Sequence, residues 1–161
     1  MLFRSIRFSK IPIIAVPFQL VLGGGVELVQ PAAHRVAAAE SYMGYVEVGV
    51  GLIPGAGGNL RMILNALDKD AGRIGAFQKI KSAFETIGFA KVATSASQAK
   101  HLGYLEDSDT IIMNSDQLLF EAKSKAIELM ENYTPPQYRK DLKLPGSGGR
   151  TAMAMALKGF K

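Results

Sequence analysis

The stretch LGGGVELVQPAAHRVAAAESYMGYVEVGVGLIPGAGGN, residues 22–59, carries most of the information about the fold, because glycine-rich turns alternate in it with apolar runs. Gly23-Gly24-Gly25 follows a short apolar run and opens a helix that we predict over residues 26–33. Residues 35–39 predict a buried strand, and a glycine-punctuated loop occupies residues 44–58. Strands that alternate with helices predict an α/β fold.

On the N-terminal side, residues 11–16 predict a further buried strand, since they are β-branched, apolar on both faces and followed by Pro17. Basic residues precede the apolar run 11–22, as they do in a targeting signal. Pro12, Pro17 and Gln19 interrupt that run, which is also shorter than the roughly 20 residues that a bilayer span requires. We therefore expect a cytoplasmic protein with no membrane segment.

On the C-terminal side, the chain becomes more helical and more charged. Apolar side chains at helical spacing predict a helix over residues 59–67, another that ends at Gly88, and a longer one that starts near residue 114. Ser95 and Gln98 form a capping box at the start of a short helix.

We divide the chain into three predicted segments. Residues 1–70 form the core with both glycine-rich motifs, residues 71–134 form a helical region, and residues 135–161 form a linker and the start of a helix. The linker is predicted to be extended over residues 137–150, because it contains Pro-Gly-Ser-Gly-Gly, and the helix is predicted over residues 151–157.

The composition excludes several classes of protein. With 48% hydrophobic and 20% charged residues, the chain is neither a disordered tail nor a coiled-coil rod. It has no cysteine, which excludes a disulfide scaffold, a thiolate zinc site and a cysteine nucleophile, and its 2 histidines argue against a metal site. The net charge of +5 suits an anionic small ligand and nucleic acid equally well.

The glycine turn at residues 23–25 is the first place where chemistry is expected. Backbone N–H groups at a helix start are unshielded and can bind an anion or an oxyanion that develops during a reaction. Glu27 lies one turn into this helix and could face the bound group. A carboxylate near a helix N-terminus is also an ordinary helix-starting preference, and the residues alone leave both interpretations open.

Glu47 is the second candidate, because it lies in an otherwise apolar segment and should be partly buried. When two carboxyl groups converge on one site, one of them tends to keep a proton. One group could then activate water while the other delivers a proton. The alternative is a solvent-exposed glutamate at the edge of a loop.

Other suggestive patterns carry less weight. Gly49-Val50-Gly51 begins like a dinucleotide fingerprint but Pro54 interrupts it, and residues 54–58 lack the Lys-Ser/Thr of a P-loop. The basic clusters at residues 69–81 and 139–143 lack interleaved aromatic residues, so we expect solvated surface and no nucleic-acid partner.

Two motifs in the central stretch resemble those of the crotonase superfamily, the enoyl-CoA hydratase and isomerase group. Residues 22–28, LGGGVEL, are similar to the LGGGCEL of that family, with Val26 in place of the common cysteine. Residues 42–49 and 51–58 are similar to its second signature. This second signature most resembles the hydratase-like part at the C-terminal side of bacterial two-domain 3-hydroxyacyl-CoA dehydrogenases of fatty-acid β-oxidation. Residues 87–96 and 99–105 resemble the same subgroup.

The resemblance implies a fold and a reaction. The fold would be an incomplete crotonase-like ββα spiral core followed by a helical C-terminal region. Glu27 and Glu47 would be the acid/base pair that adds water to a trans-2-enoyl-CoA, and the Gly24 N–H would bind the thioester oxygen. The resemblance also implies substrate-binding roles for three further glycines, Gly23, Gly25 and Gly55.

The resemblance further implies what the segment lacks and what it binds. The second oxyanion N–H of the family, and its loop on the CoA adenine, lie upstream of a position like Lys10, so we expect a fragment that is weakly active or inactive alone. Acyl-CoA would be the substrate, no metal or cofactor would be bound here, and NAD would belong only to a dehydrogenase region of a parent protein. We also expect a trimer-type homo-oligomer, or packing on the rest of a longer chain.

Two other functions stay open. An isomerase of the same group would need only one acid/base carboxylate, so the presence of both Glu27 and Glu47 favours hydration. A non-catalytic module that binds acyl-CoA or holds an oligomer together is the other alternative.

Overall fold

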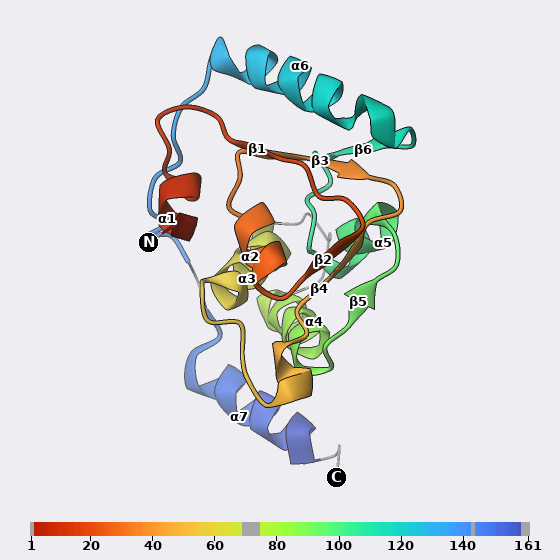
Figure 1. Ribbon diagram of the computed structural model, residues 1–161. Helices are drawn as coiled ribbons and strands as arrows, with labels where there is room; N and C mark the ends of the chain where they lie inside the picture. Colours follow the sequence, from red (N-terminus) through yellow and green to blue (C-terminus); the bar gives the residue numbers. More distant parts are fainter. Residues whose placement is uncertain (1, 69–74, 143, 159–161) are drawn as a thin grey trace.

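Two small sheets form the centre of the computed structural model, which describes residues 2–68, 75–142 and 144–158 (Figure 1). The first sheet is parallel and has the order β1-β3-β6. The second has the order β2-β4-β5, with β2 parallel and β5 antiparallel to β4. The strands are β1 (Ile14–Ala15), β2 (Leu20–Leu22), β3 (His34–Ala38), β4 (Tyr42–Gly44), β5 (Val92–Ala93) and β6 (Thr110–Ile112).

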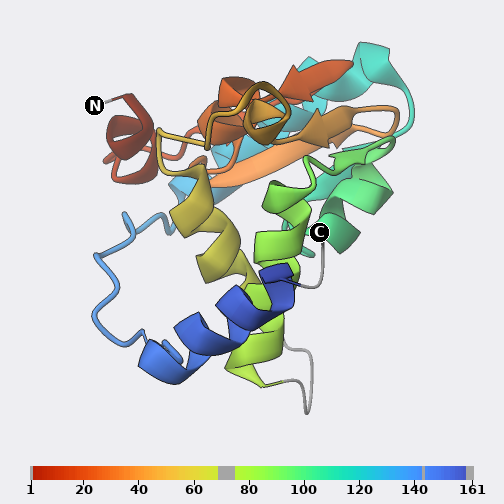
Figure 2. The same cartoon turned by 90° about the horizontal axis from the view of Figure 1, so that it is seen from below.

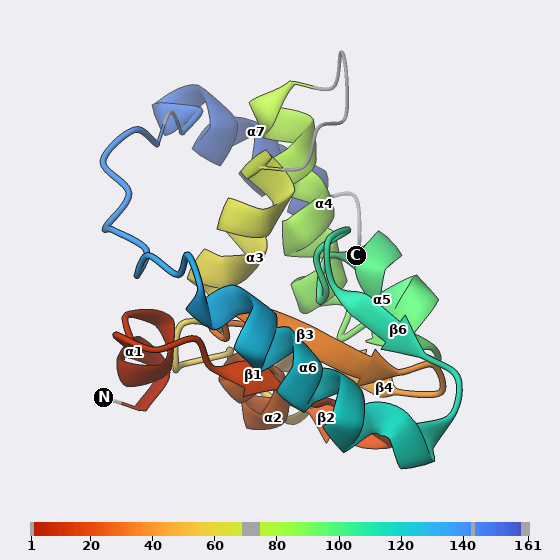
Figure 3. The same cartoon turned by 90° about the horizontal axis from the view of Figure 1, so that it is seen from above.

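Helices cover both sheets. They are α1 (Leu2–Arg7), α2 (Gly24–Val29), α3 (Gly58–Asp68), α4 (Ala76–Gly88), α5 (Ala96–Leu102), α6 (Leu118–Met130) and α7 (Gly146–Lys158). Two short 3₁₀ helices, η1 (Glu47–Val50) and η2 (Ser115–Gln117), complete the set. Figure 3 shows α6 lying over the β1-β3-β6 sheet, and Figure 2 shows α7 crossing α3 and α4.

The strand β3 is buried along its whole length because both of its faces are covered. Val36 and Ala38 pack with Leu118 and Ala122 of α6. Ala37 points to the opposite face, as the two-residue repeat of a strand requires, and joins the larger core. The strand thus separates two apolar clusters.

The larger cluster lies between the sheets and the helices α2, α3, α4 and α5. Tyr45 and Tyr104 are fully buried in it and meet edge to face, with ring centroids 5.6 Å apart. Met43 and Met62 are the next largest fully buried side chains. This cluster fixes the segment after β4 against α3, and that segment carries Glu47.

Most of the predicted helices are present. The helices predicted at residues 59–67, before Gly88 and after residue 114 correspond to α3, α4 and α6. The capping interaction at α5 is confirmed, because Ser95 Oγ accepts a hydrogen bond from the Gln98 N–H at 3.1 Å.

Two predicted elements have different bounds in the structure. The strand predicted over residues 11–16 is reduced to Ile14–Ala15, and Ile11 is 68% exposed. Pro12 and Pro17 have no N–H to donate, which limits pairing at both ends. The helix predicted over residues 26–33 begins earlier, at Gly24, and ends at Val29, just before Pro31.

The predicted extended linker is wrong for its last five residues, since α7 begins at Gly146 and contains the predicted helix 151–157. The N–H of Gly149 bonds the carbonyl of Pro145 at 3.2 Å. A Cβ at Gly149 would lie 2.6 Å from the Pro145 ring, so glycine permits the proline to pack on the first turn. The same glycines that suggested flexibility therefore allow this helix start.

Within the described part of the chain, no helix combines the length and the apolar character that crossing a bilayer demands.

Candidate active site

The glycine turn between β2 and α2 has the backbone geometry that only glycine adopts readily. Gly23 has a φ of 55° and a ψ of −124° and precedes the first residue of α2. Its N–H donates to the carbonyl of Gly44 at 2.8 Å, next to the Leu22–Gly44 pairing of β2 with β4. The turn is therefore fixed to the end of β4, three residues before Glu47.

Glu47 lies directly against this turn. A Cβ at Gly23 would be 3.1 Å from Glu47 Oε1, so the missing side chain leaves room for the carboxylate. The other oxygen, Oε2, is buried and has no hydrogen-bond partner among the described residues. Buried polar atoms normally have a partner, so this oxygen is available to a water molecule or a ligand. The structure does not support a fully solvated glutamate at a loop edge.

Glu27 Oε1, in contrast to Glu47 Oε2, has hydrogen-bond partners, which lie at the start of α3. Its side chain is buried, with the residue 6% exposed, and Oε1 accepts hydrogen bonds from the N–H groups of Ala56 and Gly58, both at 2.8 Å. These donors lie at the start of α3, where backbone N–H groups have no partner within the helix. The Glu27 carboxylate, on α2, therefore caps the start of α3. This role is more than the ordinary preference for an acidic residue near the start of its own helix.

The two glutamates come close to one buried phenol, Tyr45. Burial raises the pKa of the Tyr45 hydroxyl, and the negative charges of Glu27 and Glu47 raise it further. Burial also raises the pKa of Tyr104 to about 12, with a contribution from Glu47. The structure therefore brings together Gly23, Glu27 and Glu47 beside Tyr45.

The other predicted glycines differ in how strongly the geometry requires them. Gly24 and Gly25 are the first residues of α2, so their N–H groups have no acceptor within the helix. Gly24 is exposed, and a Cβ there would meet nothing within 4 Å. A Cβ at Gly55 would meet only the Ile53 carbonyl, at 3.9 Å, so nothing there demands glycine. Gly55 instead precedes Ala56, which holds Glu27.

A mainly apolar cavity of about 260 Å³ opens beside Glu27. Its walls come from α1, α3 and the segment 137–142, and include Phe3, Phe8, Leu60, Leu64 and Tyr138. Tyr138 stacks on Phe8 with ring centroids 4.4 Å apart, which holds the segment over the cavity. One of the two glutamates therefore borders a space that suits a hydrocarbon group.

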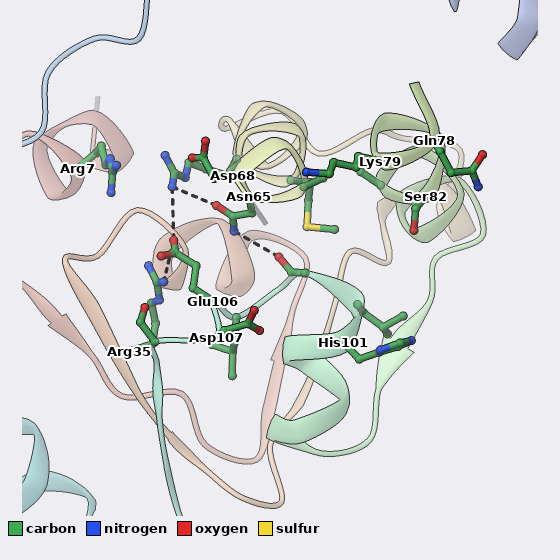
Figure 4. A pocket seen from close by; sticks show the side chains of 18 of the residues that line it. Arg7, Arg35, Asn65, Asp68, Gln78, Lys79, Ser82, His101, Glu106 and Asp107 are labelled. Carbon is green, nitrogen blue, oxygen red and sulfur yellow. Dashed lines mark hydrogen bonds and ion pairs between the residues drawn. The ribbon is translucent and has the colours of Figure 1, made fainter. Parts of the chain in front are cut away.

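A second, larger cavity of about 550 Å³ has a mixed polar and apolar lining, and Arg7 and Arg61 line both cavities (Figure 4). Glu106 bridges two arginines in it, with Oε1 at 2.9 Å from Arg35 Nη2 and 3.7 Å from Arg61 Nη2. Burial lowers the pKa of Arg61 to about 10, and the nearby charge of Arg7 adds to the effect. Neither glutamate of the glycine turn lines this cavity.

Sequence reasoning missed two residues of these sites. Arg35, the second residue of the buried strand β3, has Nε 2.8 Å from Asp109 Oδ2 and is 2% exposed. A charged residue inside a predicted buried strand was the available signal. Tyr45 was noted only as part of an apolar segment, and no local pattern shows that it would lie against Gly58, a donor to Glu27.

No group of three or more potential metal ligands occurs among residues 2–68, 75–142 and 144–158.

Comparison with known proteins gives consistent results. The enoyl-CoA hydratase/isomerase family matches residues 1–144. A probable 3-hydroxyacyl-CoA dehydrogenase of Bacillus subtilis is 41% identical over 157 residues, which are 98% of this chain and 20% of that protein. A crotonyl-CoA hydratase of Syntrophomonas wolfei is 42% identical over 60 residues, which are 37% of this chain and 23% of that protein. The chain therefore spans only about a fifth of the first relative.

Solved structures agree on the fold. An enoyl-CoA hydratase subunit of Geobacillus kaustophilus has a TM-score of 0.61 and 25% identity, covering 98% of this chain and 50% of the other. An enoyl-CoA hydratase of Bacillus anthracis has a TM-score of 0.60 and 27% identity, covering 81% of this chain and 44% of the other. The predicted α/β fold of the crotonase type, with a helical C-terminal region, is confirmed.

Proposed function

Because the chain belongs to the enoyl-CoA hydratase/isomerase family, we propose that Glu27 and Glu47 add water across the double bond of a trans-2-enoyl-CoA to give a 3-hydroxyacyl-CoA. The observation that carries the proposal is the buried, unpartnered Oε2 of Glu47, beside the same glycine turn that carries Glu27. A buried oxygen without a partner is costly unless a water molecule or substrate satisfies it during the reaction.

The two carboxyl groups divide the proton transfers. One carboxylate accepts a proton from water while the water oxygen bonds to C3 of the substrate. The other, initially protonated, delivers its proton to C2, so the sum of the two steps is addition of H and OH. Glu27 Oε1 already accepts two backbone N–H groups, which leaves its second oxygen to contact the water.

The thioester oxygen gains negative charge as water adds. The Gly24 N–H would donate to it, because this residue is exposed and its N–H lacks an acceptor within α2. Loss of one such donor typically costs about 10²–10³ in rate. Gly23, Gly25 and Gly55 would act through the backbone, by keeping the turn and the loop after Glu47 close to the substrate.

The substrate and its context follow from the same proposal. The cavity beside Glu27 would accept the hydrocarbon part of the acyl group. The Bacillus subtilis relative is a probable 3-hydroxyacyl-CoA dehydrogenase, which supports fatty-acid β-oxidation as the context. In that case a dehydrogenase region would use the 3-hydroxyacyl-CoA product with NAD, and this segment would need no cofactor. A cytoplasmic location stays a prediction.

The test is hydration of crotonyl-CoA, followed by loss of the absorbance of the conjugated double bond. It is run on this chain and on a chimera that carries the preceding half of a solved relative upstream. We expect Glu27→Gln and Glu47→Gln each to reduce kcat about 10²–10⁴-fold. Unchanged turnover in either variant would contradict the proposal.

The same assay separates the alternatives. An isomerase would convert a 3-enoyl-CoA and retain activity in one of the two glutamine variants. A binding module would show affinity for acyl-CoA, retained in Glu47→Gln, with no turnover in either protein.

A further inference from the structure

Among the described glycines, Gly58 leaves the least room between its backbone and a neighbouring side chain, that of Tyr45. A Cβ at Gly58 would lie 2.5 Å from both Oη and Cζ of Tyr45 and 2.7 Å from Cε1. Tyr45 is fully buried, so the phenol has no room to withdraw. The end of the ring therefore determines how closely the first residue of α3 can approach.

That first residue of α3 also holds Glu27. The Gly58 N–H donates to Glu27 Oε1 at 2.8 Å, and the Ala56 N–H donates to the same atom at the same distance. Any shift of Gly58 relative to Tyr45 must change these hydrogen bonds. Tyr45 thus lies against Gly58, one of the two donors that fix the Glu27 carboxylate.

The Tyr45 hydroxyl also hydrogen-bonds to the end of α2, the helix that carries Glu27. Tyr45 Oη donates to Gln30 Oε1 at 2.5 Å, and Gln30 is the C-terminal cap of α2. The Gln30 amide donates in turn to the carbonyls of Gly103 and Tyr104, both at 3.4 Å. Tyr45 therefore sets the distance between the helix that carries Glu27 and the turn that binds its carboxylate.

We propose that Tyr45 is a positioning residue that holds the Glu27 carboxylate in place through the backbone of Gly58, without contact to the substrate. The expected effect on turnover rests on the proposed function, whereas the expected effect on the position of the Glu27 carboxylate rests on geometry alone. Because misplacement of a reacting group by about 1 Å can cost 10²-fold in rate, a small change at Tyr45 should affect turnover.

Tyr104 offers a matched control for the loss of the hydroxyl. It is also fully buried, and its Oη donates a hydrogen bond of the same length, 2.5 Å, to the carbonyl of Lys91. Among the described residues, no hydrogen bond joins the Tyr104 side chain to Glu27, Ala56 or Gly58, and its hydroxyl lies near the backbone N–H of Tyr45 instead. Tyr45→Phe and Tyr104→Phe therefore each remove one buried hydroxyl, and only that of Tyr45 lies against Gly58.

The first measurement is amide NMR of the protein labelled with ¹⁵N, with Glu27→Gln used to identify the signals of Ala56 and Gly58 that report the carboxylate. We expect Tyr45→Phe to shift both signals and to speed the hydrogen exchange of the Gly58 amide at least several-fold. Tyr104→Phe should leave both signals in place. Equal effects of the two variants on these signals would overturn the inference.

The second measurement is hydration of crotonyl-CoA in the protein that turns over. We expect Tyr45→Phe to lower kcat about 10-fold with KM within about twofold, since the change affects a catalytic group and not substrate binding. Tyr104→Phe should keep kcat within about twofold. If Glu27→Gln is fully active, the proposed function fails, while the NMR result still decides the positioning role.

Gly58→Ala tests the same contact from the other side if Tyr45→Phe does not fold. The new Cβ meets the phenol and must push the turn away from it. The same two amide signals should shift, and kcat should fall with KM little changed. A folded Gly58→Ala protein with unchanged signals and kcat would contradict the inference.

Discussion

At the scale of single residues, Gly23 is the point that the site depends on most. Its carbonyl accepts hydrogen bonds from the N–H groups of Val26 and Glu27, and its missing side chain makes room for Glu47. The role of glycine here was predictable from the sequence, because a glycine turn before a helix is a local pattern. The position of the Glu47 side chain against this turn depends on tertiary packing, so it could not be predicted from the sequence.

Replacement of Gly23 by alanine should damage both stability and activity. The left-handed φ of 55° costs an L-residue about 1–2 kcal/mol, and the Cβ would displace the Glu47 carboxylate. Gly49→Ala is the control, because a Cβ there meets nothing within 4 Å and its φ is not in the left-handed region. Thermal unfolding and hydratase assays of both variants check this. Equal behaviour of the two proteins would contradict it.

His34 should make stability depend on pH. Burial lowers the pKa of His34 below its ordinary value, and the charge of Asp109 opposes this only in part. The unfolded chain then binds a proton more readily, so the free energy of unfolding falls as the pH drops below about 6.5 and levels off below the folded pKa.

The variant His34→Gln should flatten this dependence between pH 7 and pH 5. The exposed His101 supplies the matched control, His101→Gln, which should follow the parent protein. Chemical denaturation at each pH gives the free energy of unfolding. A His34→Gln curve parallel to that of the parent would show that His34 does not contribute.

At the scale of elements, the helices were predicted far better than the strands. α3, α4 and α6 carry apolar stripes over 11 to 13 residues, long enough for the 3.6-residue period to show. β4, β5 and β6 are only 2 or 3 residues long and exist because a neighbouring strand pairs with them. A pattern of that length has no period to detect, so they were missed.

The pair Arg35 and Asp109 joins β3 to the loop before β6, and removal of either side chain would leave the other charge buried without it. Arg35 Nη1 also donates to the carbonyls of Gln30 and Ala32, at 3.2 and 3.1 Å. Breaking a buried pair typically costs about 3–5 kcal/mol, so Asp109→Asn should lower the free energy of unfolding by that order.

The double variant Arg35→Met, Asp109→Leu should recover part of this loss, because it leaves no buried charge without a partner. Lys125→Ala, which breaks the exposed pair with Glu128, should change the unfolding midpoint little. Denaturation curves of the three proteins test the argument. A double variant less stable than Asp109→Asn would contradict it.

At the scale of the whole molecule, α6 has an outer side that nothing described covers. Four large apolar side chains on it are more than half exposed: Leu119, Phe120, Ile127 and Met130. Their spacing places them within about 100° of the helix circumference, while Leu118 and Ala122 face the sheet. An exposed apolar strip of this kind is typical of a contact surface.

We therefore keep the prediction of a homo-oligomer and assign it to this strip. Phe120→Glu should shift the mass in solution toward the monomer, while Glu128→Lys, at an exposed position of the same helix outside the strip, should leave it unchanged. Light scattering after size-exclusion chromatography measures both. A parent protein that is monomeric at all accessible concentrations would contradict the prediction.

The central claim is that Glu27 and Glu47 act as one unit around Gly23, and a double-variant cycle tests it most directly. Hydration of crotonyl-CoA is measured for the parent, Glu27→Gln, Glu47→Gln and the double variant. Residues that act together are strongly non-additive, so the double variant should be no slower than the slower single variant, within about threefold. Losses that multiply across the two variants, or a single variant with parental turnover, would contradict the account.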